Sequence, residues 1–153
     1  MDRMAEHFRP DAWSLLLVDE PRQELYFSLA AGSAAESLKN VRLKLGEGIA
    51  GWVAKHGERV IVPDVYTDAR FAKRIDEMTK WETRSIICVP LQSKQKVLGV
   101  VQLINVDKDA FSDHELFFLQ GLCDNAAAAI ESARELESRN KHEGRADAAN
   151  SAE

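Results

Sequence analysis

The sequence is poor in cysteine and contains no long hydrophobic run. Two cysteines among 153 residues are too few for a disulfide framework, and neither belongs to a Cys-x-x-Cys pair that would suggest zinc. Cys88 lies in a strand-like run and Cys123 in a helix-like one, so we expect both thiols to be buried. No apolar stretch approaches the roughly 20 residues that span a bilayer. The charged stretch 1–10 lacks the apolar centre of a signal peptide, which predicts a cytoplasmic protein with no membrane partner.

An excess of positive charge is also missing. The formal net charge is −5, whereas binding to nucleic acid needs a basic face. We therefore expect no nucleic-acid partner. The four histidines are scattered and form no His-Glu-x-x-His motif or His–carboxylate cluster, so we predict no metal site and no cofactor. They are His7, His56, His114 and His142.

The remaining composition is that of one globular domain. Hydrophobic residues make up 45% of the chain and charged residues 29%, an ordinary balance for a folded protein. The last residues, 141–153, are small and polar and are expected to be disordered. We therefore predict a single domain over 1–140.

Strand-like and helix-like segments alternate along the chain. Runs with strand patterns cover 13–20, 24–32, 41–45, 59–62, 84–92 and 96–106, and helical spacing covers 2–8, 49–56, 68–81 and 113–140. This order predicts an α+β fold with one antiparallel sheet, helices on one face and smaller elements on the other. The tight connection at 93–95 places the strands 84–92 and 97–106 side by side near the middle of the sheet.

The helix expected at 113–140 has features of a partner-binding helix. Ser112 and Glu115 form a capping box at its start. An apolar stripe follows at spacings of three and four, and it consists of Leu116, Leu119, Cys123, Ala126, Ile130 and Ala133. At 1.5 Å per residue the helix is about 42 Å long, which is longer than a small sheet needs. We expect a homodimer through this helix, although the half up to Ile130 would also cover the sheet.

Four glycines fall within the stretch LGEGIAGWVAKHG. A Gly-rich entry to a helix is suited to phosphate binding, because the first N–H groups are unpaired and the helix dipole is positive there. The same glycines would also be needed for a tight turn from strand to helix. The pattern alone leaves both readings open.

Several short stretches, in a fixed order, resemble a GAF domain. They are LGEGIAGWVAKHGERVIVPDV, ARF, TRSIICVPL, VLGVVQLIN and FSDHELFFLQ. The resemblance covers about residues 12–135 and is closest to the regulatory domains of cyclic-nucleotide phosphodiesterases and some adenylyl cyclases. It implies a central antiparallel sheet with a cap of short helices and loops, and a small molecule held between them.

The resemblance also implies ligand contacts. It places a phosphate at the backbone N–H groups of Ile49 and Ala50, and a sugar or base near Gln102 and the cap. The cavity is expected to be bounded by Ile49, Ala50, Phe71, Asp76, Thr79, Thr83 and Gln102. Hydroxyls and a carboxylate suit the mixed donors and acceptors of a nucleotide.

The chain departs from the signature of the cyclic-nucleotide branch, which is Asn, Lys, Phe, Asp and Glu. Asn105 and Phe111 are kept, whereas Val106, Glu115 and Leu116 replace the other three. The Lys–Asp ion pair of that branch therefore cannot form in the same way, which weakens the expectation of cyclic GMP in particular.

We predict a non-enzymatic, small-molecule-binding sensory domain for signal transduction, with a cyclic nucleotide as the candidate ligand. One alternative is a ligand-free GAF dimerisation module. A weaker alternative is a free methionine sulfoxide reductase, an enzyme of the same fold whose several cysteines near the pocket this chain does not match.

Overall fold

The structure is a computed structural model. It describes residues 11–32, 35–71, 74, 82–94, 96–106 and 112–151, the last twelve of these by their backbone alone. The helical turn expected at 2–8 and most of the helix expected at 68–81 lie outside the described residues.

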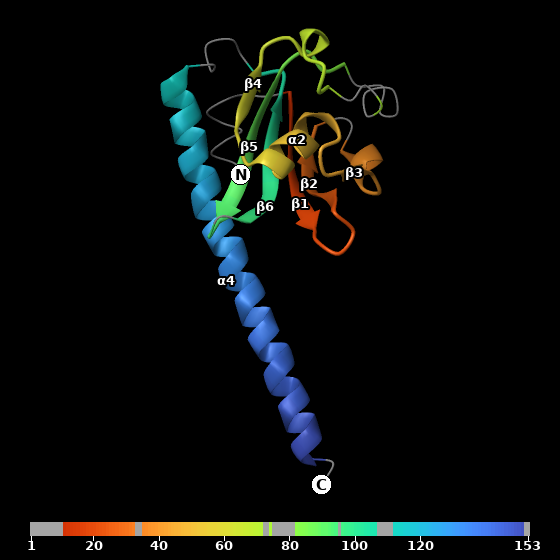
Figure 1. The fold of residues 1–153 in the computed structure, drawn as a ribbon, viewed down its shortest axis with the longest axis vertical. Coiled ribbons are helices and arrows are strands. Elements are labelled where there is room, and N and C mark those ends of the chain that lie inside the picture. Colours follow the sequence, from red (N-terminus) through yellow and green to blue (C-terminus); the bar gives the residue numbers. More distant parts are fainter. Residues whose placement is uncertain are drawn as a thin grey trace.

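A six-stranded antiparallel sheet forms the centre of the domain, with the strand order β3-β2-β1-β6-β5-β4 (Figure 1). The strands are β1 (Ala12–Asp19), β2 (Glu24–Ala31), β3 (Arg42–Lys44), β4 (Val60–Val62), β5 (Ile86–Ser93) and β6 (Lys96–Ile104). The expected α+β fold is confirmed, with β6 in the middle of the sheet beside β5. The mostly apolar β1 also has an inner position, between β2 and β6.

The two faces of the sheet are covered by different helices. The nine-residue helix α2 (Gly48–His56) packs on one face, where Ile49, Ala50 and Val53 join an apolar cluster with Leu16 and Val100. The long helix α4 (Asp113–Ser151) covers the other face. We call the α2 side the cap face, because the segment between β4 and β5 also contributes to it.

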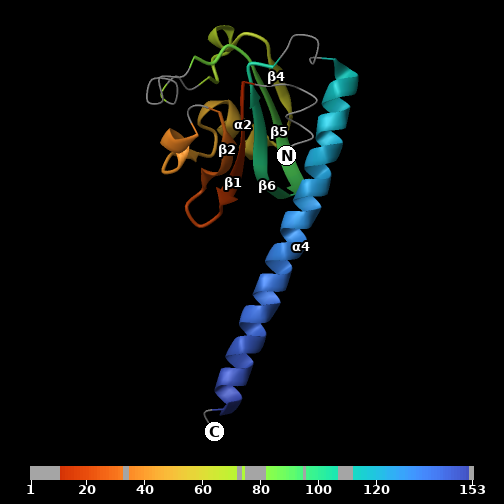
Figure 2. The same ribbon diagram turned by 180° about the vertical axis from the view of Figure 1, so that it is seen from behind.

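Helix α4 begins as the sequence predicts and ends later. Ser112 Oγ accepts a hydrogen bond from the Glu115 N–H at 3.2 Å, which is one half of the expected capping box. The apolar stripe from Leu116 to Ile130 packs against the sheet. The helix then continues to Ser151, past the expected end near Asn140 and into the stretch expected to be disordered. Figure 2 shows this second half running beyond the sheet.

Short elements complete the described chain. The 3-10 turn η1 (Glu36–Leu38) occupies the loop after β2, and η2 (Val65–Thr67) follows β4. Gly57 ends α2 in a left-handed conformation, with φ 71°, and its N–H donates to the Val53 carbonyl at 2.8 Å. No helix in the described part of the chain is long and apolar enough to cross a membrane.

Candidate functional site

The first turn of α2 depends on its glycines. Gly48 has φ 70°, a conformation that residues with a side chain rarely adopt. Gly51 sits against the strand that precedes the helix, since a Cβ there would lie 2.7 Å from the Lys44 carbonyl oxygen. Both glycines are therefore needed for the turn itself, whatever else this turn does.

The same turn presents unpaired backbone donors. The first N–H of α2 with a helical partner is that of Gly51, which donates to the Glu47 carbonyl at 3.1 Å. The N–H groups of Ile49 and Ala50 precede this bond, and no backbone carbonyl of the described residues accepts a hydrogen bond from either of them. Both residues are almost fully buried, 3% and 2% exposed. The helix dipole would favour an anion at these donors.

A polar pair lies on the cap face of the sheet. Gln102 on β6 is opposite Ser14 on β1, and both share a face with Leu16 and Val100 of the cap-face cluster because side chains alternate along a strand. Ser14 is 2% exposed, and its Oγ forms no hydrogen bond with any described residue. A buried hydroxyl without a partner is unfavourable by about 1–3 kcal/mol. Such a group in a packed sheet points to a partner that is not part of the described chain.

The end of the segment between β4 and β5 is fixed to the sheet. We call residues 63–85 the cap; its described residues are 63–71, 74 and 82–85. The Asn105 side chain accepts hydrogen bonds from the N–H groups of Arg84 and Ser85, at 2.7 and 3.2 Å, and donates to the Glu82 carbonyl at 3.1 Å. Thr83 lies inside this clamp and is 2% exposed.

The beginning of the cap is held on α2. The Arg70 guanidinium lies over the Trp52 ring, 4.6 Å from its centroid, and is also bonded to the Asp68 carboxylate. Phe71 follows directly and packs against the cap-face cluster. The Arg70 guanidinium in turn holds the pKa of the Asp68 carboxyl below its usual value.

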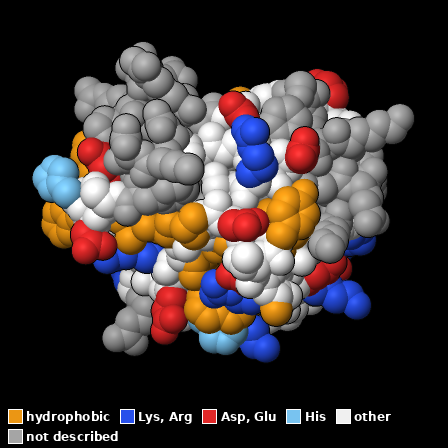
Figure 3. All heavy atoms as spheres, turned by 90° about the horizontal axis from the view of Figure 1, so that it is seen from above, with side chains coloured by type: hydrophobic (Ala, Val, Ile, Leu, Met, Phe, Trp, Pro, Cys, Tyr) orange, Lys and Arg blue, Asp and Glu red, His pale blue; other side chains and the backbone are white. Residues whose placement is uncertain are grey.

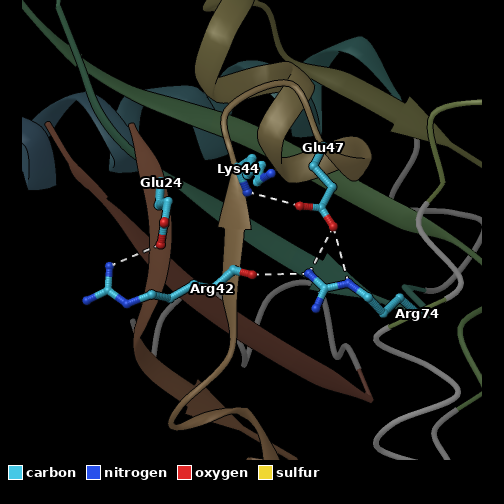
Figure 4. Close-up of a pocket in the computed structure, with 5 residues that line it drawn as sticks. All are labelled: Glu24, Arg42, Lys44, Glu47 and Arg74. Atoms are coloured by element: carbon cyan, nitrogen blue, oxygen red, sulfur yellow. Dashed lines mark hydrogen bonds and ion pairs between the residues drawn. The ribbon is translucent and has the colours of Figure 1, made fainter. Parts of the chain in front are cut away.

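A charged hollow of about 500 Å³ lies beside the start of α2 (Figure 4). It is lined by Glu24, Arg42, Lys44, Glu47 and Arg74. Arg74, from the cap, donates to Glu47 Oε1 from Nη2 at 2.9 Å and from Nε at 3.2 Å. The Lys44 N–H donates to the other Glu47 oxygen at 3.0 Å. These donors, first the Lys44 N–H and then Arg74, lower the pKa of the Glu47 carboxyl, whereas burial opposes them.

The structure brings together five of the seven predicted site residues on the cap side. Ile49, Ala50 and Phe71 belong to one cluster, Gln102 shares its face, and Thr83 lies at the end of the cap. Asp76 and Thr79 lie outside the described residues, so their roles stay predictions.

Sequence reasoning missed three residues of the site: Ser14, Glu47 and Arg74. The signal for Ser14 was a single hydroxyl inside the apolar run WSLLLVD. No local pattern pairs Glu47 with Arg74, because they are 27 residues apart and meet only in the fold.

The two cysteines are buried on opposite faces of the sheet. Cys88 belongs to the cap-face cluster and Cys123 to the cluster under α4. Burial raises the pKa of the Cys123 thiol to about 12 and that of Cys88 further above its usual range. Neither thiol is suited to act as a nucleophile at neutral pH. Among the residues that the structure describes, no three His, Cys, Asp or Glu side chains form a metal-binding group.

Figure 3 shows the domain from above, and on the face seen there the described acidic and basic side chains are interspersed. They form no continuous basic stripe of the kind that follows a nucleic-acid backbone.

The profile of the GAF domain family matches residues 1–130. The chain belongs to the GAF domain family. This GAF domain is 40% identical over 84 residues to the dual 3′,5′-cyclic-AMP and -GMP phosphodiesterase 11A of Takifugu rubripes, a match covering 52% of the chain and 9% of that protein.

A second relative matches a longer part of the domain. It is the probable 3′,5′-cyclic phosphodiesterase pde-5 of Caenorhabditis elegans, 33% identical over 111 residues, or 67% of the chain and 15% of that protein. The solved GAF domain of an Acinetobacter phosphoenolpyruvate-protein phosphotransferase superposes with a TM-score of 0.76 at 27% identity, covering 90% of this chain and 80% of that one. The domain thus spans only a small fraction of the phosphodiesterases it matches.

The departures from the cyclic-nucleotide signature have a physical consequence in this GAF domain. Val106 and Leu116, at the positions of the Lys and the Glu, lie in the same apolar cluster under α4. Apolar packing therefore occupies the place of charged groups at this junction. Asn105 keeps its position and forms the clamp on the cap.

Proposed function

We propose that this GAF domain is a non-enzymatic regulatory module that binds a small anionic ligand, with a cyclic nucleotide as the first candidate. The proposal is carried by the buried hydroxyl of Ser14, opposite Gln102, which has no hydrogen-bond partner among the described residues. The free donors in the first turn of α2 support it, because they offer a site for a phosphate on the same side of the sheet. The phosphodiesterase relatives support the choice of cyclic nucleotides as probes.

In this arrangement the residues have distinct roles. The N–H groups of Ile49 and Ala50 would hold the phosphate. Ser14, Thr83 and Gln102 would bond to the base or sugar, since hydroxyl and amide groups both donate and accept. Asp76 and Thr79 are proposed to contact the sugar or base from the cap.

The burial of both cysteines supports a non-enzymatic role over a methionine sulfoxide reductase. A redox site needs an accessible thiolate, and the fold holds both thiols neutral and enclosed. We also propose that the protein is located in the cytoplasm.

A ligand-free dimerisation module is the second candidate, and the exposed part of α4 favours it. All described side chains from Ser132 to Arg139 are exposed, and Leu136 among them is 60% exposed. We propose a homodimer through this part of the helix in either case, so the ligand test decides between the candidates.

Thermal unfolding with cyclic AMP or cyclic GMP tests the proposal. Saturation at 100 times the Kd adds about 2.7 kcal/mol to the free energy of unfolding, a shift of about 5–10 °C for a domain of this size. The variant Ser14→Ala should bind at least about fivefold more weakly, because a hydroxyl contact to the ligand is lost. Without ligand it should unfold at the same temperature or higher, because an unpaired buried hydroxyl is removed.

Ser28→Ala, at an exposed position on β2, is the matched control and should change neither quantity. If neither nucleotide shifts the melting temperature at millimolar concentration, the ligand-free module is the better description. A loss of stability in ligand-free Ser14→Ala would show instead that the hydroxyl has a structural partner.

A further inference from the structure

The side of α4 that faces away from the sheet carries a regular pattern of its own. Five exposed residues follow one another at spacings of three and four, which is the repeat of a seam between paired helices. We call this set the outer seam; it consists of Phe118, Gly121, Asn125, Ala128 and Ser132. A Cβ added at Gly121 would meet no described atom within 4 Å. The described part of the domain therefore leaves the middle of the outer seam open to a partner.

Bulky and small residues lie at opposite ends of the outer seam. Phe118 and the adjacent Phe117, which are 40% and 75% exposed, lie near the start of α4, and Ser132 lies at the far end. If a second copy pairs antiparallel about Asn125, each Phe118 lies opposite the other copy's Ser132, because both are seven residues from Asn125. A parallel pair would place Phe118 on Phe118 and Ser132 on Ser132. The antiparallel pair alternates large and small residues and therefore allows even packing along the seam.

The charges beyond the two ends of the outer seam favour the same orientation. Asp113 and Arg139 are both exposed. In the antiparallel pair, Asp113 of each copy lies within about 3 Å, along the helix axis, of the other copy's Arg139. A parallel pair would bring two aspartates together at one end and two arginines together at the other, and like charges repel. The exposed charges of α4 are therefore complementary to those of a second α4 only when the two helices run in opposite directions.

The antiparallel orientation also supports the half of α4 that leaves the sheet. The first half packs on the sheet up to Ile130, whereas the second half runs beyond it, as Figure 2 shows. In the antiparallel pair, residues 132–137 of each copy lie along residues 113–118 of the other copy, which that copy's own sheet holds in place. In a parallel pair, two unsupported stretches would contact only each other. Since isolated helices are marginally stable in water, the antiparallel pair stabilises the second half better.

We propose that the outer seam docks onto the outer seam of a second copy of this chain in the antiparallel orientation, with Asn125 at the two-fold axis. This inference rests on the homodimer proposed above and not on a ligand, and it adds which residues meet and in which direction the helices run. The two sheets then lie on the outer sides of the helix pair. Both cap faces point away from the interface, because α4 covers the opposite face of each sheet.

Single engineered cysteines distinguish the two orientations, since both native cysteines are buried. The variants Asn125→Cys and Ser132→Cys are equilibrated with reduced and oxidised glutathione, and Ser138→Cys, on another side of the helix, is the control. Asn125→Cys should cross-link in most of the protein, because the two thiols lie opposite each other at the axis. Ser132→Cys should not cross-link, because its two copies are about 21 Å apart along the axis, too far for a disulfide. Ser138→Cys should also stay unlinked.

Each other pattern of cross-linking overturns the inference. Equal cross-linking of Asn125→Cys and Ser132→Cys alone would show a parallel pair, and equal cross-linking of all three variants would show random collision. No cross-linking in any variant would exclude the outer seam as an interface, whether sedimentation at about 100 µM shows monomers or dimers. None of these results depends on a ligand, so the proposed regulatory function is tested separately by the thermal shift with cyclic nucleotides.

Exchange of the two terminal charges tests the pairing by a second route. Asp113→Lys and Arg139→Glu should each raise the Kd of the dimer about fivefold, because the exposed ion pair occurs twice in the dimer. The double variant restores opposite charges and should return to within about twofold of the wild type. Losses that add in the double variant would overturn the antiparallel pairing, since the two positions would then be independent. The melting temperature of each variant shows whether it is folded.

Discussion

Two polar residues near the ends of the neighbouring strands β1 and β6 differ in their hydrogen bonding. The Asn105 side chain forms three hydrogen bonds to the backbone of residues 82–85, and its φ of 56° is a conformation that Asn tolerates better than most residues. The buried Ser14 hydroxyl has no partner among the described residues. Asn105 therefore has a complete structural role, whereas the part of the chain that the structure describes offers no hydrogen-bond partner for Ser14.

The burial of the Cys88 and Cys123 thiols leads to a prediction about the stability of the domain at alkaline pH. Both pKa values are raised in the folded state, so the fold keeps these groups neutral. Their stabilising effect is complete below the unfolded pKa of about 8.5 and is lost as the pH rises above it, because the unfolded chain then ionises. Relative to pH 7, each thiol should lower the free energy of unfolding at pH 10 by about 2 kcal/mol.

Urea unfolding at pH 7 and pH 10 measures this effect. Cys123→Val should lose less stability between the two pH values than the wild type, by about the share of one thiol. Equal losses in both proteins, or rapid reaction of either folded thiol with Ellman's reagent at pH 8, would contradict the burial of these side chains.

At the scale of elements, strong local patterns were predictable and long-range contacts were not. The apolar alternation of β5 and β6 and the short link between them fix a hairpin, and the capping box fixes the start of α4. The end of α4 was harder to predict, because the small polar residues after Asn140 carry no apolar stripe. The sequence could not decide whether the glycine-rich turn before α2 binds a phosphate or only links the strand to the helix, because the same backbone conformation serves both.

Helix α2 offers a prediction about that turn. Gly51→Ala should destabilise the domain by about 1–3 kcal/mol, because the added Cβ would lie 2.7 Å from the Lys44 carbonyl oxygen and displace the first turn. Gly121→Ala in α4 is the matched control, since a Cβ there meets no described atom within 4 Å. It should stabilise the domain by about 0.5–1 kcal/mol through helix propensity.

Thermal unfolding of the two variants measures both effects. If Gly51→Ala is as stable as the wild type, the close approach of α2 to β3 is wrong, and the proposed phosphate donors would be displaced with it.

At the scale of the whole molecule, the sheet separates the proposed ligand site from the helix that leaves the domain. Strands β5 and β6 contribute to both faces, with Cys88 and Gln102 towards the cap and Val89 and Leu103 towards α4. The hairpin between them also contacts the helix, since Ser93 donates to Glu131. Lys94 Nζ lies 3.8 Å from Glu131 and 3.4 Å from Glu135. These contacts lie where α4 begins to run beyond the sheet, so they fix the end of the β5–β6 hairpin to the helix at that point.

The proposed homodimer must use a different side of α4 from the stripe that the sheet covers. Ala129 and Leu136 are both exposed and lie seven residues apart, the repeat of a coiled coil, and Leu136 is 60% exposed. A helix of this length that has no packing partner is only marginally stable in water. We therefore expect Leu136→Glu to convert a dimer into a monomer at about 100 µM, near the weak end of useful affinities.

Ser138→Glu introduces the same charge at an exposed position two residues further on, about 200° around the helix, and should leave the dimer intact. Sedimentation velocity distinguishes the states, and thermal unfolding shows whether the domain itself is changed. A wild-type monomer at this concentration, or an equal effect of the two substitutions, would exclude the Leu136 side as the interface. This half of α4 would then be open to a different partner, because every side chain from Ser132 to Arg139 is exposed.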